Sequence, residues 1–488
     1  MPGQDVVDFD RSVPLLIVKI GHYVIHHGGV GAIRTLGRAG VSVYAVTEDR
    51  LTPAAVSRYL TGRFVAPTTG LEDDSRLLEI FAGIGKQLGR PVIALPTDEE
   101  AAVFVAEHAD ELSPWFITPQ VNPSLPRRLA SKRGLHDICV ELGIPTPHAV
   151  FPTSLANVRT FAQEATFPVV AKNVDPFSRL RDPAVGSSTI IRTPESLLTL
   201  AADWSDPPSV MLQEYIPSAV AEDWIFHGYF DVSSECLVGF TGVKYRSWPP
   251  LGGVTSYARI VTNETLAQLS AEMCRRLGFR GIVDLDWRFD RRDQRYKLLD
   301  FNPRVGAQFR LFETTAGIDV VRAMHLDLTG RPIPPGVPVA GRGFAVEYLD
   351  APARIAYRRL GPCALPVAHL PGRVEPAWFA RDDLMPFVVA SARSSVPLAR
   401  HIWRLSPRLT TGVKAATWPR RLDTEAPILR GARSDPRTNL NSAPNLAAAV
   451  SAEKYTLGIE NSTEALGKGE PATYRKEVRT SEPRKSSV

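Results

Sequence analysis

Acidic side chains alternate with apolar ones along residues 281–304, and their spacing could place several oxygen ligands on one surface. Asp284 and Asp286 lie in the first alternating run, Asp300 and Asn302 lie in the second, and a short charged turn separates the two. Period-two alternation is typical of half-buried strands, so the segment predicts a β-hairpin. In that hairpin Asp286 faces Asp300, Asp284 faces Asn302, and all four side chains share one face. The opposite, apolar face is expected to carry Val283, Leu285, Trp287, Leu299 and Phe301.

The chemistry of this polar face favours a metal ion. Like charges directly opposite each other repel, so two paired carboxylates indicate a cation between them. The predicted ligands, Asp286, Asp300 and Asn302, offer oxygen atoms alone, which favours Mg²⁺ or Mn²⁺ over zinc. Arg304 follows two residues later and could hold an anion. The alternative is a solvated hairpin face whose charges keep the protein in solution.

Two further strands carry cations in apolar surroundings. Residues 167–174 predict a buried strand with Lys172 in its middle, and a buried ammonium is costly unless it finds an anion. Residues 237–243 predict another strand, which leads to Lys244 and Arg246 beside a loop rich in proline and glycine. Two cations at such a loop suit a substrate carboxylate or an acyl phosphate. A basic strand that faces solvent is the alternative.

Composition and charge describe an ordinary globular chain. It has 488 residues, 44% of them hydrophobic and 22% charged, with a formal net charge of +5, and about three domains are expected for this length. Its four cysteines form no CxxC pair, which argues against a zinc finger or a disulfide scaffold and favours a reducing compartment. No apolar run approaches the ~20 residues of a membrane span, and the acidic N-terminus does not resemble a signal peptide. We therefore predict a cytoplasmic protein without a nucleic-acid partner.

The N-terminal part alternates between strand and helix patterns. Residues 13–20 form an apolar run, a glycine-rich turn at residues 28–31 leads into a helix, and residues 41–46 form a second strand pattern that ends near Glu48. This order is the outline of a dinucleotide-binding unit, although the glycine spacing differs from G-x-G-x-x-G. An NAD(P)-dependent oxidoreductase is therefore one alternative. The loop before the glycines contains three histidines, which predict either metal ligation or a hydrogen-bonded loop: His22, His26 and His27.

The segment from Asp300 to Arg304, D-F-N-P-R, with Asp286 on the preceding strand, resembles the metal-binding end of the ATP-grasp fold. Asp300 stands where the family more often has glutamate, whose longer side chain is better suited to bridging two metal ions. Residues 125–330 follow the family's order: two lysines, a hinge acid, a ribose acid, a metal acid and D-x-N-x-R. The chain is therefore similar to ATP-grasp ligases over most of its length.

The resemblance implies roles for individual residues. For the phosphates of ATP it implies Lys132 and Lys172, with Ser187 in the small-residue loop that covers them. For the adenine and the ribose it implies the segment Gln213, Glu214, Tyr215 and Ile216, followed by Glu222 or Asp223. For the metal, Mg²⁺ or Mn²⁺, it implies Asp286, Asp300 and Asn302. For catalysis it implies Arg304, assisted by Lys244 or Arg246.

The expected architecture combines α/β and α+β parts. From the N-terminus these parts are a Rossmann-like domain (12–120), an ATP-grasp domain (121–330, with a nucleotide lobe at about 125–216 and a catalytic, metal-binding lobe at about 217–330), a small accessory region (331–424) and a disordered tail (425–488). Residues 400–421 are basic and contain two tryptophans, which suits weak contact with an anionic membrane surface. A solvated cationic face is the alternative.

The expected activity is that of an ATP- and Mg²⁺-dependent carboxylate–amine ligase, similar to the D-aspartate-ligase-like and carbamoyl-phosphate-synthase-like members of the superfamily. A substrate carboxylate would be activated as an acyl phosphate, and an amine would then displace phosphate to form an amide, with ADP and phosphate as products. The expected partners are small-molecule acids and amines of amino-acid or peptide type, and a homodimer remains open. The alternatives are the oxidoreductase and a degenerate ATP-binding module without turnover.

Overall fold

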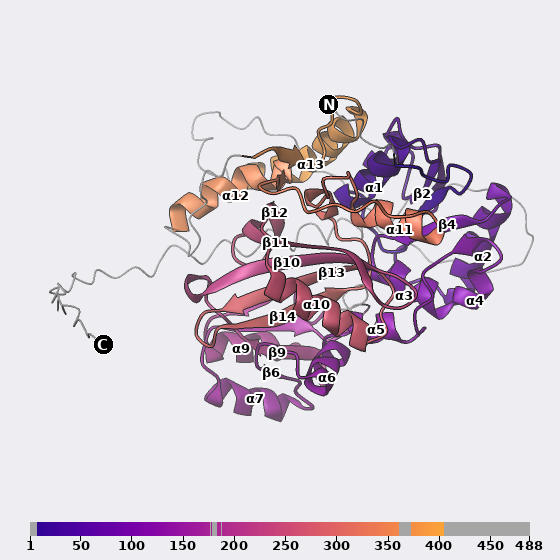
Figure 1. Cartoon of the computed structure of the whole chain (residues 1–488). Helices are drawn as coiled ribbons and strands as arrows, with labels where there is room; N and C mark the ends of the chain where they lie inside the picture. Colours follow the sequence, from indigo (N-terminus) through magenta and orange to yellow (C-terminus); the bar gives the residue numbers. More distant parts are fainter. Residues whose placement is uncertain (1–6, 176, 178–182, 187, 361–371, 405–488) are drawn as a thin grey trace, which may run out of the picture. The chain divides into compact units, whose positions relative to one another are not determined.

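The computed structural model describes residues 7–404, apart from 176, 178–182, 187 and 361–371. The described elements belong to one compact unit, Met1–Arg437, and their strands form three sheets (Figure 1). The predicted tail, 425–488, and most of the basic stretch 400–421 lie outside the described residues. In the described part of the chain, no helix is long and apolar enough to cross a membrane.

The first sheet is parallel and has the strand order β3-β2-β1-β4-β5. Its elements are β1 (Leu15–Val18), α1 (His27–Gly37), β2 (Val43–Thr47), β3 (Gly62–Val65), α2 (Asp74–Leu88), β4 (Val92–Pro96), α3 (Glu99–Glu107) and β5 (Phe116–Ile117). Leu15 and Ile17 pack into one core with α1, whereas Leu16 and Val18 pack into a second core with α2. Both faces of β1 are therefore buried, which explains its continuous apolar sequence.

The second sheet is antiparallel, with the order β6-β9-β7-β8. Its elements are α6 (Lys132–Leu142), β6 (Ala149–Val150), α7 (Leu155–Glu164), β7 (Val169–Asn173), β8 (Thr189–Ile191), α9 (Pro194–Ala201) and β9 (Val210–Glu214). Val158 of α7 and Leu197 of α9 pack against the sheet through Val169 and Leu212. Lys172 is buried in β7, as the sequence predicts, but it is the next-to-last residue of this strand rather than in its middle.

The third sheet has the order β14-β13-β10-β11-β12-β15-β16. Its elements are β10 (Ala221–Phe230), β11 (Cys236–Trp248), β12 (Val254–Ile260), α10 (Glu264–Arg276), β13 (Gly281–Asp290), β14 (Arg295–Asn302), α11 (Val320–Leu328), β15 (Gly343–Ala345) and β16 (Val374–Pro376). Met273 of α10 packs with Leu285 on one face, and Met324 of α11 packs with Ile225 on the other. Strands β15 and β16 come from the predicted accessory region and extend this sheet.

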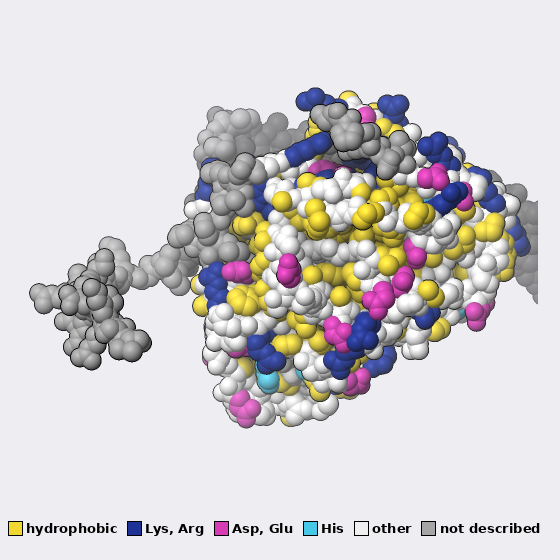
Figure 2. All heavy atoms as spheres, viewed as in Figure 1, with side chains coloured by type: hydrophobic (Ala, Val, Ile, Leu, Met, Phe, Trp, Pro, Cys, Tyr) yellow, Lys and Arg dark blue, Asp and Glu magenta, His cyan; other side chains and the backbone are white. Residues whose placement is uncertain are grey.

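Short helices and the C-terminal helices complete the described chain. They are η1 (Pro53–Val56), α4 (Ala109–Leu112), α5 (Leu125–Ala130), η2 (Ser218–Val220), η3 (Phe309–Leu311), α12 (Glu347–Leu360) and α13 (Met385–Arg404). On the face shown in Figure 2, hydrophobic side chains alternate with scattered positive and negative ones, and neither sign of charge dominates a large area.

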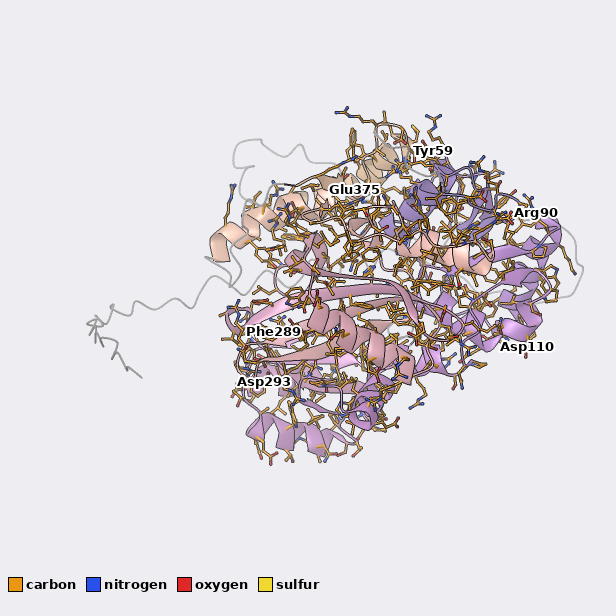
Figure 3. The ribbon with its side chains drawn as sticks, viewed as in Figure 1. Tyr59, Arg90, Asp110, Phe289, Asp293 and Glu375 are labelled. Carbon is orange, nitrogen blue, oxygen red and sulfur yellow. The ribbon has the colours of Figure 1, made fainter. Side chains whose placement is uncertain are left out.

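The predicted hairpin is formed by β13 and β14. Asp286 pairs with Asp300 and Asp284 pairs with Asn302, which confirms the expected register. In Figure 3, the label Asp293 marks the turn at the end of the hairpin. The prediction that Leu299 belongs to the apolar face was wrong. A β-bulge makes Trp287 pair with Leu298, so Leu298 is 2% exposed in the core and Leu299 is the extra residue.

Candidate active site

Lysines from the second sheet and its helix reach a carboxylate on the third sheet. Lys132 begins α6, where Ser131 caps the helix by accepting the backbone N–H of Gly134. Its ammonium contacts Asp300, and the ammonium of Lys172 lies 3.6 Å from the other oxygen of that carboxylate. Burial lowers the pKa of Lys172, and the Asp300 charge opposes this effect. Burial raises the pKa of Asp300, but the two lysines outweigh it and the net pKa is lowered.

A third lysine neutralises the neighbouring carboxylate. Lys244 on β11 donates to Asp286 on β13 over 2.5 Å, across the intervening strand β10. Burial alone would lower the pKa of Lys244, but the carboxylates of Asp286 and Asp284 raise it overall. Burial raises the pKa of Asp286, as do the charges of Asp284 and Asp300, while Lys244 opposes this shift. The three adjacent acids are thus tolerated because cations surround them.

Arg304 connects this cluster to the parallel sheet. One of its nitrogens lies 3.2 Å from Asp284 and another donates to Glu99, at the start of α3, over 2.8 Å. Asp284 also lies 2.7 Å from the fully buried ring of His227. Burial raises the pKa of Asp284, but His227 and Arg304 lower it to about 2. A Cβ on Gly306 would lie 2.3 Å from the His227 ring, so this loop needs glycine for its close approach.

The predicted metal ligands share one end of the hairpin. The side-chain nitrogen of Asn302 donates to the backbone carbonyl of Asp284 over 3.1 Å, which leaves its Oδ1 for another partner. Within the described residues, no group of three His, Cys, Asp or Glu side chains forms a metal cluster. The two opposed carboxylates and the amide oxygen are donors of the type that suits Mg²⁺, an ion that commonly takes further ligands from phosphate and water.

The hinge between the two antiparallel regions contains the predicted adenine-binding segment. Gln213 and Ile216 are buried and Tyr215 is half-buried. Glu214 accepts the backbone N–H of His148 over 3.1 Å and also faces Arg292 and Lys297, at 3.2 Å and 3.4 Å. The Glu214 side chain is thus held by protein partners, and its backbone N–H donates to the carbonyl of His148 over 2.8 Å.

The two predicted ribose acids have different partners. Glu222 accepts from Arg291 over 2.6 Å and from the indole N–H of Trp224 over 3.1 Å. Asp223 accepts from Arg288 over 2.6 Å. The remaining predicted phosphate contact, Ser187, lies outside the described residues.

Arg246 does not join the cluster. Its guanidinium donates to Asp350 of α12 through two bonds of 2.7 Å and 3.1 Å, and it lies over the ring of Tyr257 at 4.3 Å. Both charged side chains are buried, at 8% and 5% exposure. Arg246 thus bonds to α12, whereas Lys244 contacts Asp286.

The start of α1 is closed to a dinucleotide. His26 caps this helix by accepting the backbone N–H of Gly29 over 3.1 Å. A Cβ on Gly28 would lie 2.9 Å from the Cα of Ala307, so the loop after β14 already covers the helix N-terminus. A bound pyrophosphate would need those groups. This geometry argues against the NAD(P) alternative. Burial also lowers the pKa of His26 to about 3 and that of His27 to about 4.

Comparisons with known proteins identify a relative in sequence and similar solved structures. No family model matches the chain. D-aspartate ligase of Enterococcus faecium (strain Aus0004) is 22% identical over 312 residues, which cover 61% of this chain and 73% of the relative. The structure of N5-carboxyaminoimidazole ribonucleotide synthetase in complex with ADP matches with a TM-score of 0.51 and 11% identity, over 67% of this chain and 80% of that chain. The ADP complex of N5-carboxyaminoimidazole synthetase from Staphylococcus aureus gives 0.50 and 10%, over 68% and 81%.

The chain has the ATP-grasp fold. The fold class expected from the sequence is thereby confirmed for the described residues. Three residues that contact predicted site residues were not found from the sequence. They are Glu99, which pairs with Arg304, His227, which pairs with Asp284, and Arg288, which pairs with Asp223. The alternation of β13 does place Arg288 on the same face as Asp286, which was the available signal for this residue.

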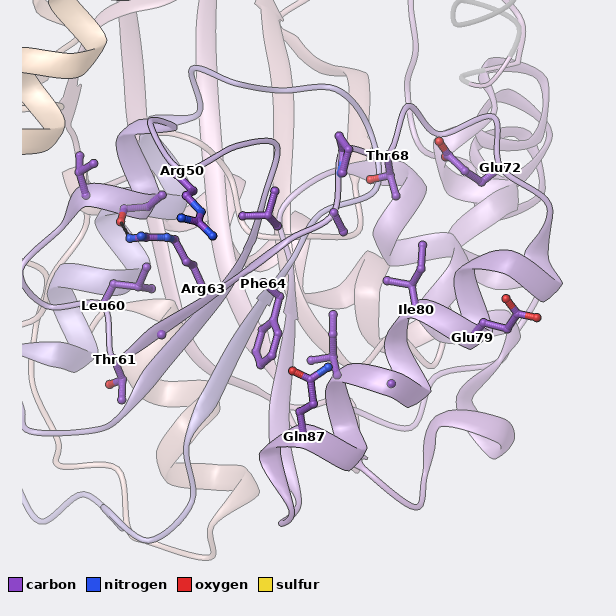
Figure 4. A pocket seen from close by; sticks show the side chains of 18 of the residues that line it. Arg50, Leu60, Thr61, Arg63, Phe64, Thr68, Glu72, Glu79, Ile80 and Gln87 are labelled. Carbon is purple, nitrogen blue, oxygen red and sulfur yellow. Dashed lines mark hydrogen bonds between the residues drawn. The ribbon is translucent and has the colours of Figure 1, made fainter. Parts of the chain in front are cut away.

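A large hollow lies away from the cluster of Lys132, Lys172, Asp286 and Asp300. Its volume is about 1330 Å³, and it lies between β3 and α2 of the parallel sheet, where Phe64, Ile80 and Gln87 line it (Figure 4). None of the predicted site residues lines this hollow.

Proposed function

We propose that this chain is an ATP-dependent carboxylate–amine ligase. The observation that carries the proposal is the meeting of Lys132 and Lys172 with Asp300. One ammonium group from the second sheet, one from its helix α6 and a carboxylate from the third sheet would provide both halves of a Mg–triphosphate site. The similarity to D-aspartate ligase supports a reaction in which one substrate is an amino acid.

Different residues would bind the adenine, the phosphates and the metal ion. The backbone of the hinge that ends in Ile216 would bind the adenine, and Lys132 and Lys172 would exchange Asp300 for phosphate oxygens. The residues that would hold Mg²⁺ are Asp286, Asp300 and Asn302, and the bound ion would neutralise charge on the phosphate oxygens during transfer.

The proposed reaction has two steps. A carboxylate oxygen of the acid substrate forms a bond to the γ-phosphorus as the bond to the β-phosphate oxygen breaks, which gives an acyl phosphate and ADP. The amine nitrogen then forms a bond to the carbonyl carbon, phosphate leaves with the bonding electron pair, and the amine proton passes to solvent. Arg304 and Lys244 would supply the positive charge that stabilises the transferred phosphoryl group and the oxyanion.

ADP release tests the proposal directly. The full chain, supplied with ATP, Mg²⁺ and pairs of amino acids or short peptides, is expected to release ADP with at least one pair and to form an amide detected by mass spectrometry. Excess EDTA should abolish the release, and added Mg²⁺ should restore it. An absence of ADP release despite tight ATP binding would instead support the degenerate ATP-binding alternative.

Four finer expectations from the sequence are still predictions. Cytoplasmic location and a homodimer remain predictions, and so does use of Mn²⁺ in place of Mg²⁺. Membrane contact through 400–421 also remains a prediction, because most of that stretch lies outside the described residues.

A further inference from the structure

Arg288 bonds to the chain where it crosses between the second and third sheets. This crossing lies between the end of β9 and the start of β10 and contains Ile216. Arg288 donates from one terminal nitrogen to the backbone carbonyl of Ile216 over 2.6 Å. Its other terminal nitrogen donates to Asp223 over 2.6 Å. The guanidinium therefore joins the hinge backbone and an acid of β10 through the same planar group.

The position of Arg288 on β13 links the hinge to the metal-binding face. Asp286 and Arg288 are two residues apart, so their side chains share a face and are separated by about 6–7 Å along the strand. Asp223 lies directly opposite Arg288 on β10, and Ile225 lies directly opposite Asp286. The strand that carries a predicted metal ligand thus also sets the position of the hinge carbonyl.

A neighbouring ion pair provides a natural comparison. Arg291 donates to Glu222 over 2.6 Å, which is the same distance as in the pair of Arg288 and Asp223. The side chain of Arg291 is 39% exposed, whereas that of Arg288 is 9% exposed. The structure gives the Arg291 side chain no bond to the hinge backbone among the described residues. The two pairs therefore differ in burial and in their connection to the hinge.

We propose that Arg288 is a positioning residue for ATP, and that Asp223, rather than Glu222, is the ribose-binding acid of this site. The proposal deepens the proposed function and rests on it. Arg288 fixes the carbonyl of Ile216 at a set position relative to Asp286, so that adenine and triphosphate are bound in one geometry. The Asp223 side chain is 36% exposed and only its Oδ1 is bonded to Arg288, which leaves Oδ2 for a ribose hydroxyl.

The test compares Arg288→Met with Arg291→Met in the full chain. Titration calorimetry with Mg–ATP should give an affinity about 10- to 100-fold weaker for Arg288→Met, the scale expected for losing a charged hydrogen-bonding group. Arg291→Met should bind within about twofold of the unmodified chain. In the ADP-release assay, Arg288→Met should raise the KM for ATP, while kcat at saturating ATP stays close to that of the unmodified chain.

Two more variants separate positioning from folding. Arg288→Lys keeps a cation that can reach one of the two acceptors, so it should restore part of the affinity even if Arg288→Met folds poorly. Asp223→Asn should weaken Mg–ATP binding more than Glu222→Gln does. Equal affinities for Arg288→Met, Arg291→Met and the unmodified chain would overturn the inference and leave the proposed function intact. An unmodified chain that does not bind Mg–ATP would overturn the proposed function itself.

Discussion

Replacing Asp300 by asparagine is expected to lower the rate of ADP release by at least about 100-fold, the scale of removing one electrostatic stabiliser from an active site. Asp300 is the carboxylate that Lys132 and Lys172 both approach, and it is also a predicted metal ligand. Asparagine keeps the shape and one acceptor oxygen but removes the charge. The measurement is steady-state ADP release at saturating ATP, with the Tm recorded for each variant.

A control substitution on the same hairpin distinguishes loss of the Asp300 charge from damage to the hairpin. Asp293 lies in the turn, 41% exposed, where it accepts from Lys297 at 3.0 Å. Asp293→Asn should therefore leave ADP release within about twofold, because exposed ion pairs contribute little. Normal turnover by Asp300→Asn would remove Asp300 from the site. An equal loss in both variants would indicate damage to the hairpin.

Replacing Lys172 by methionine is expected to reduce turnover at fixed ATP by about 100-fold, the scale of removing one electrostatic stabiliser from an active site. The buried ammonium is costly in the free protein, and burial already lowers its pKa. Methionine fills a similar volume without that cost. The loss should appear as weaker ATP binding, because Lys172 is proposed to bind phosphate, and titration with ATP measures it.

The matched control is Lys86→Met, on the exposed side of α2. This variant should bind ATP as the unmodified chain does. If Lys172→Met keeps its ATP affinity, the lysine serves only to neutralise Asp300, and the phosphate-binding role is wrong.

The parts of the site that the sequence predicts depend on regular alternation. The pairing of Asp286 with Asp300 could be predicted from the sequence. Alternation of apolar and polar residues sets both the face and the register of an antiparallel strand pair. Lys172 stood out because it is a charged residue in an apolar strand. Such signals are local, and the fold class followed from their order along the chain.

Two departures from regular alternation on these strands have one physical cause. Lys244 and Arg246 would share a face of a regular strand, but a bulge leaves Tyr245 without a partner between them. Arg246 consequently bonds to Asp350, while Lys244 bonds to Asp286. A second bulge placed Leu298 in the core instead of Leu299.

The long-range partners were invisible for a different reason. Glu99 and His227 are distant from Arg304 and Asp284 in sequence, and neither carries a periodic signal. Glu99 begins a helix after a strand of the parallel sheet, and His227 lies on a buried strand. The contact of Glu99 follows from how the parallel sheet packs against the third sheet, whereas that of His227 follows from the pairing of β10 with β13. The sequence pattern specifies neither.

A crystal structure of the full chain with Mg²⁺ and a non-hydrolysable ATP analogue tests the central claim most directly. The account predicts a Mg²⁺ ion about 2.0–2.1 Å from oxygens of Asp286, Asp300 and Asn302, with Lys132 and Lys172 moved onto phosphate oxygens. A nucleotide bound elsewhere, with both lysines still on Asp300, would contradict it.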